Sequence, residues 1–176
     1  MDGRGVNAAS EVGPIRPEKA VYPLVVILTM FILPAGSALW EAMSLAQPDP
    51  LLLVGKWFVF WGVGVRLSLA GLRQYTRPAF TSRDILGIES PDVFVLVREL
   101  GAANIASGVV GLVSLAMPTF ILPSALAAGI FYAFAGIEHG KSKHRGVNET
   151  IAMVSDIFIA VVLLGFAAGA LARRLH

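Results

Sequence analysis

Five apolar stretches, each long enough to cross a membrane, limit the folds that this chain can adopt. A bilayer core of about 30 Å is crossed by roughly 20 apolar residues in helical form. The chain has 176 residues, of which 56% are hydrophobic and only 15% are charged. The sequence therefore predicts an all-α integral membrane bundle of about five transmembrane helices, at approximately residues 22–45, 51–73, 92–116, 119–138 and 149–172.

The remaining sequence is short and suggests one domain preceded by a tail. Residues 1–20 are polar and rich in glycine, proline and alanine, and we expect a polar N-terminal tail there. Residues 21–176 then form a single transmembrane helical domain. The first and third connections contain AQPDP and MP, in which proline ends a helix. We expect antiparallel hairpins at both places.

Lysine and arginine are divided unevenly between the two predicted sides of the membrane. Because cytoplasmic loops are enriched in these residues, the charge pattern predicts the N-terminus inside and the C-terminus outside. The richer side contains Arg4, Arg16, Lys19, Arg73, Arg77, Arg83, Lys141, Lys143 and Arg145, and the poorer side contains Lys56, Arg173 and Arg174.

Composition removes several classes of function. The chain has no cysteine, which excludes disulfides, thiolate nucleophiles and cysteine-ligated metals. Its formal net charge is only +2, and no basic face indicates a nucleic-acid partner. No catalytic motif and no metal-binding spacing is present, so an enzyme is the less favoured class. A bound cofactor, if any, is unknown at this stage.

Polar residues within the predicted spans are the main candidates for a site. Ionised side chains at membrane depth cost about 2.5–3.5 kcal/mol each by insertion scales, so they normally face protein or water. Arg66, Glu99 and Asp156 all lie about 10–13 Å along their helices from the predicted cytoplasmic ends. We predict a buried polar cluster in the inner leaflet, consisting of Arg66, Arg98, Glu99, Asn104 and Asp156.

Three interpretations of this cluster remain open. The charges neutralise one another in an ion-pair lattice that fixes helix packing. Alternatively, they line a pocket for a proton, an ion or a small anion. In the third interpretation, the side chains never meet, and Arg98 extends along its stem to the interface.

A second polar group flanks the fourth predicted loop. Glu138 and His139 end one span, while Asn148 and Glu149 begin the next, with Asn148 suited to cap the helix and Glu149 to complement its dipole. These four residues form a candidate interfacial polar group. Glu138, His139, His144 and Glu149 offer metal-binding donor types, but their spacing favours no metal.

The segments VRELGAANIASGVVGL, GIFYAFAGIEH and NETIAMVSDIFI resemble a family of small bacterial integral membrane proteins known only as a domain of unknown function. The resemblance covers roughly residues 55–165 and implies a multi-pass protein of the bacterial inner membrane. More distantly, Glu99, Gly101 and Gly108 resemble a helix of the DoxX-type membrane proteins.

Two hypotheses for function follow from these observations. The first is a non-catalytic accessory or assembly subunit of a larger membrane complex, in contact with other membrane subunits or with further copies of itself. The alternative is a small proton- or anion-handling transporter that uses the inner-leaflet Arg/Glu/Asp cluster.

Overall fold

The computed structural model describes residues 17–142 and 146–175, and every regular element in this part of the chain is helical. Five helical segments are long and apolar enough to cross a membrane, which confirms the all-α fold and the five predicted spans. The spans are Val21–Ser44, Pro50–Thr76, Pro91–Val113, Pro118–Lys141 and Val147–Arg173. Most of the predicted polar tail lies outside the described residues, and the first helix begins within its last four.

The first two spans change helical type along their length. The first consists of α1 (Pro17–Ile27), η1 (Leu28–Ile32) and α2 (Leu33–Ser44), and the second of α3 (Pro50–Phe58), η2 (Val59–Val65) and α4 (Arg66–Thr76). Both η1 and η2 are π-helical, with hydrogen bonds from residue i to residue i+5. Such wider turns rotate the side chains that follow them and release carbonyl groups for other partners.

The other spans are more regular. A short helix α5 (Pro78–Phe80) and a π-helical turn η3 (Thr81–Ile85) follow α4, and a 3₁₀ turn η4 (Pro91–Val93) leads into α6 (Phe94–Val113). After the turn η5 (Pro118–Phe120), α7 (Ile121–Lys141) and α8 (Val147–Leu175) complete the bundle.

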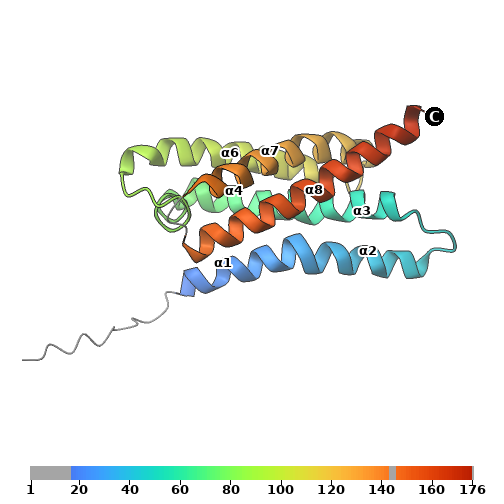
Figure 1. The fold of residues 1–176 in the computed structure, drawn as a ribbon, viewed down its shortest axis with the longest axis horizontal. Helices are drawn as coiled ribbons and strands as arrows, with labels where there is room; N and C mark the ends of the chain where they lie inside the picture. The colour runs from blue at the N-terminus through green and yellow to red at the C-terminus, as the bar shows by residue number, and fades with distance from the viewer. Residues whose placement is uncertain (1–16, 143–145, 176) are drawn as a thin grey trace, which may run out of the picture.

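The bundle has two distinct ends (Figure 1). At the N-terminal end, α1 begins, and the connection at residues 77–90, the end of α7 and the start of α8 lie close to it. The C-terminal end holds the loop between α2 and α3, the turn between α6 and α7, and the end of α8. Helix α8 crosses the bundle obliquely, packing mainly on α7 and also on α3 and α1.

The predicted hairpins are only partly correct as packing units. Helices α2 and α3 pack on each other, as expected, but α6 packs mainly on α4 and η2, while α7 packs mainly on α8. A tight turn joins α6 to α7, yet the two helices share few contacts because each has a closer partner elsewhere.

Glycines let the second and third spans approach each other closely. The buried face of α6 consists of Val97, Gly101, Asn104, Gly108 and Gly111. A Cβ atom added at Gly111 would lie 2.5 Å from the backbone nitrogen of Gly64, and one added at Gly101 would lie 2.9 Å from the carbonyl oxygen of Gly71. Only glycine allows this backbone contact, which holds α4 beside α6.

Three polar contacts stabilise the C-terminal end of the bundle. Lys56 Nζ lies 2.7 Å from Glu41 Oε1, and Trp57 Nε1 donates to Glu41 Oε2 at 2.7 Å, so this network joins α2 to α3. Arg173 donates to Asp49 Oδ2 at 2.5 Å and so connects α8 to the same hairpin. Desolvation raises the pKa of Asp49, but hydrogen bonds from Arg173 and from backbone amides outweigh it and hold the pKa below its ordinary value.

Candidate functional site

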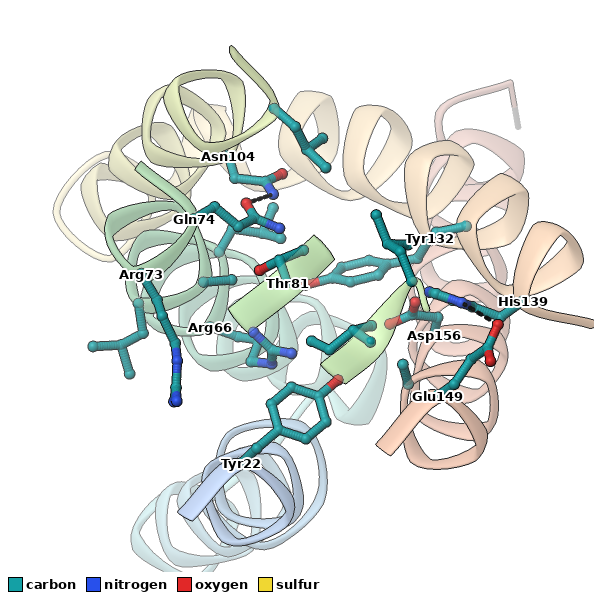
Figure 2. Close-up of a pocket in the computed structure, with 18 of the residues that line it drawn as sticks. Tyr22, Arg66, Arg73, Gln74, Thr81, Asn104, Tyr132, His139, Glu149 and Asp156 are labelled. Atoms are coloured by element: carbon teal, nitrogen blue, oxygen red, sulfur yellow. Dashed lines mark hydrogen bonds and ion pairs between the residues drawn. The ribbon is translucent and has the colours of Figure 1, made fainter. Parts of the chain in front are cut away.

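A cavity of about 490 Å³ lies at the N-terminal end of the bundle, among α1, α4, α6, α7 and α8 (Figure 2). Its walls combine apolar and polar side chains. The polar lining residues are Tyr22, Arg66, Arg73, Gln74, Thr81, Asn104, Tyr132, Glu138, His139, Glu149 and Asp156.

The deepest polar level of the cavity, which we call the inner tier, consists of Arg66, Tyr132 and Asp156. The Arg66 guanidinium carbon lies 5.6 Å from the centre of the Tyr22 ring. The Tyr132 hydroxyl donates to the carbonyl oxygen of Gly62 at 2.6 Å, and that carbonyl belongs to the π-helical η2. Asp156 is 8% exposed. The inner tier therefore presents a cation and a carboxyl group around a fixed tyrosine.

A second level, the outer tier, lies nearer the N-terminal end and consists of Arg73, His139 and Glu149. His139 Nδ1 lies 3.7 Å from Glu149 Oε1, and both side chains are largely buried. Arg73 stacks over Phe80, with its guanidinium carbon 3.7 Å from the ring centre. The outer tier thus repeats the chemical order of the inner one: a cation from α4, a titratable or hydroxyl group from α7, and an acid from α8.

Spacing along the three helices explains this repetition. Arg66 and Arg73, Tyr132 and His139, and Glu149 and Asp156 are each separated by seven residues. Seven residues make almost two full helical turns, so both members of each pair occupy one face, about 10 Å apart along the axis. Helices α4 and α7 run toward the N-terminal end of the bundle, and α8 runs away from it. Arg73, His139 and Glu149 therefore lie nearer that end than Arg66, Tyr132 and Asp156.

Charge is separated across the cavity. Figure 2 shows both arginines on one side and Asp156, His139 and Glu149 on the other. Within residues 17–142 and 146–175, Asp156 forms no ion pair with Arg66, and no hydrogen bond to its carboxyl group is present. Arg66 Nε is also buried without a hydrogen-bond acceptor in this part of the chain. Arg66 and Asp156 therefore line the same cavity without pairing with each other.

The segment formed by α5 and η3 lines part of the N-terminal side of the cavity. Pro78, Phe80, Thr81 and Ser82 are all buried. Ser82 accepts a backbone hydrogen bond from Ile88 at 2.8 Å, and its hydroxyl donates to the Ile88 carbonyl. The sequence suggested an ordinary cytoplasmic loop here, whereas the structure folds its first part back into the bundle.

The structure brings together three of the five residues of the predicted buried cluster. Arg66, Asn104 and Asp156 line the same cavity, and Asn104 Nδ2 donates to Gln74 Oε1 at 2.8 Å. Arg98 and Glu99 are exposed, so their predicted burial is wrong. The bundle-facing stripe of α6 includes Val97 and Gly101, and a rotation of 100° per residue turns Arg98 and Glu99 away from that stripe.

The predicted interfacial group is divided in a different way. Glu138, His139 and Glu149 line the cavity, although Glu138 is exposed at its rim and forms an ion pair with Lys141 at 2.6 Å. Helix α8 begins at Val147, so Asn148 lies inside the first turn and is not the residue that caps it. His144 lies outside the described residues. Among those described, no three histidine or acidic side chains are arranged to hold a metal ion.

Sequence reasoning missed several lining residues. Arg73 was interpreted only as a topological charge, and Tyr22, Gln74 and Thr81 were not singled out as site candidates. The seven-residue spacing from Arg66 to Arg73, together with the same spacing on two other helices, was the available signal. No comparable pattern indicated Tyr22 or Thr81, because α1 and η3 reach the cavity through tertiary packing.

Comparison with known families gives a clear result. Residues 21–175 match the model of the family of unknown function DUF6790, and the chain belongs to this family. No curated protein and no solved structure shows a significant match to it. The family carries no assigned activity, so function has to be argued from the cavity.

Proposed function

We propose that this member of the DUF6790 family is a small transporter that binds a small anion together with a proton in the cavity. The observation that carries this proposal is the pair formed by Arg66 and Asp156, which line one cavity without forming an ion pair. A lattice built only for packing would bring the two charges into contact, because buried charges are stable mainly when paired.

The side of the cavity that carries Arg66 and Arg73 is suited to an anionic ligand. Guanidinium groups bind carboxylate, phosphate and halide ions through several N–H donors. Arg66 and Arg73 present two such groups about 10 Å apart along α4, on one face of the helix. A small anion entering from the N-terminal end meets Arg73 first and Arg66 at greater depth.

The opposite side of the cavity carries side chains that can bind a proton. His139 and Glu149 lie at the entrance and Asp156 at the inner end, and chains of such groups serve as proton relays in membrane proteins. An anion held by Arg66 favours protonation of the facing carboxyl group, since it removes the positive charge that stabilises the carboxylate. Anion and proton therefore bind more readily together than separately.

The expected setting is a bacterial inner membrane with the N-terminal end of the bundle in the cytoplasm. Support comes from the excess of lysine and arginine at this end, where Arg73, Arg77 and Arg83 are found. In this orientation the cavity is filled from the cytoplasm.

A flux assay on purified protein in proteoliposomes tests the proposal. Gradients of chloride, nitrate or inorganic phosphate are imposed, and a trapped pH dye reports proton movement. We expect at least one anion to drive proton movement faster than in empty vesicles, and Arg66→Gln to abolish this difference. Arg173→Gln, which alters an exposed ion pair at the opposite end, serves as the matched control and keeps full activity. Equal proton movement in wild-type protein and empty vesicles for all three anions would contradict the proposal.

A second candidate is an accessory subunit of a larger membrane complex. It is favoured by Arg98 and Glu99, which are exposed within a membrane span. Charged groups at this depth normally face protein or water, so their exposure points to a neighbouring protein.

A further inference from the structure

Helix α6 carries two charged side chains on surfaces that do not face its own bundle. Arg98 and Glu99 are both exposed, and about 10–12 Å of helix separates them from Pro91, where the span begins. Within the described ranges, 17–142 and 146–175, neither side chain has a hydrogen bond or an ion pair. A lipid chain offers such groups no partner, and Glu99 is too short to reach the headgroups by extension.

The surface around Glu99 has the pattern of a helix interface. Val95, Glu99, Ala102, Ala106 and Val109 are all exposed and recur at alternating intervals of four and three residues. This interval is the repeat by which two helices pack side by side with a small crossing angle. Alanine at the two central positions permits a close approach between helices, and Arg98 lies at the edge of the stripe.

We propose that α6 packs against α6 of a second copy of this chain, with Arg98 of each copy paired with Glu99 of the other. Two copies inserted in the same direction have parallel α6 helices related by a two-fold axis along the membrane normal. Arg98 and Glu99 are adjacent in sequence, so both pairs form at nearly the same depth. Because the same surface carries both a positive and a negative charge, it is complementary to the same surface of another copy. This complementarity favours a second copy over an unrelated subunit.

The interface is independent of the cavity. The opposite face of α6, with Gly101 and Gly108, packs against α4 in the same chain and remains there in the dimer. Loss of the dimer and loss of transport are therefore separate outcomes.

Cross-linking with single cysteines tests the interface in native membranes, because the chain itself contains no cysteine. Ala102→Cys is expected to form a disulfide-linked dimer when oxidant is added. Ala127→Cys, an exposed alanine near the middle of α7, is the matched control and is expected to remain monomeric. Equal cross-linking at both positions, monomer only at both, or capture of a different protein by Ala102→Cys would overturn the proposal.

A charge exchange tests the pairing itself. In the Ala102→Cys background, Glu99→Arg places like charges at the interface, and we expect loss of the cross-linked dimer. Combining it with Arg98→Glu restores both pairs with their signs reversed, and we expect the dimer to return. Unchanged cross-linking in the Glu99→Arg variant would contradict the pairing. Should that variant fail to fold, the comparison of Ala102→Cys with Ala127→Cys still decides whether the interface exists.

Discussion

Replacing Gly71 by alanine is expected to destabilise the bundle by about 1–3 kcal/mol, the range found for overpacked cores. The added Cβ would lie 2.5 Å from the carbonyl oxygen of Gly101 and 2.7 Å from the backbone nitrogen of Ile105. Both are backbone atoms, so no side chain can rotate to relieve the contact and α6 has to move away from α4.

The matched control is Gly36→Ala, on α2. A Cβ atom at Gly36 would meet no atom within 4 Å. Since alanine is favoured over glycine in helices by roughly 0.5–1 kcal/mol, this variant is expected to be neutral or slightly stabilised. Thermal unfolding in mild detergent gives both values, and equal stability of the two variants would contradict the close packing of α4 on α6.

The second large effect is expected from Asp156→Asn. Asparagine keeps the shape of the side chain but cannot take up and release a proton in the physiological range. We expect complete loss of anion-driven proton movement in proteoliposomes, with the melting temperature close to that of the wild type. The buried site gains a neutral group of the same size, so the packing around it is retained.

The control for this variant is Asp92→Asn, because Asp92 is exposed in the turn η4 and lies outside the cavity. Its proton movement should equal that of the wild type. Full activity in Asp156→Asn would contradict a role for Asp156 in proton movement.

Hydropathy was sufficient to predict the five spans, because the length of an apolar stretch is set directly by bilayer thickness. Counting along the helices placed Arg66 and Asp156 at similar distances from their helix ends, and both residues line one cavity in the structure. Depth alone did not separate Asp156 from Glu99, since both lie at similar distances from their helix ends. Rotation about the helix axis separates them: Asp156 shares a face of α8 with Glu149 and lines the cavity, whereas Glu99 faces away from the bundle.

The rotation of α6 depends on its glycines. Gly101, Gly108 and Gly111 occupy the side that packs against Gly64 and Gly71, so Asn104 turns inward with them. The sequence contained this stripe, but many small residues in a membrane helix can serve such contacts. Which ones do so depends on the partner helix.

Two other features depend on tertiary contacts, and no local sequence pattern predicted them. The π-helical turn η2 places the Gly62 carbonyl where Tyr132 can donate to it, at 2.6 Å. The fold of α5 and η3 into the bundle depends on Phe80, which lies between Arg73 and Tyr22. Neither contact follows from the order of residues within its own segment.

Thiol labelling offers the most direct test of the central claim, that the cavity is a polar site reached from the N-terminal end. Ala152 and Ala160 lie on α8 and are each 4% exposed, but only Ala152 lines the cavity. The native chain has no cysteine, so each alanine-to-cysteine variant contains a single thiol. A charged, membrane-impermeant thiol reagent is added to inside-out vesicles, and modification is measured by mass spectrometry. The account predicts modification of Ala152→Cys and protection of Ala160→Cys; equal protection, or equal modification, of the two would contradict it.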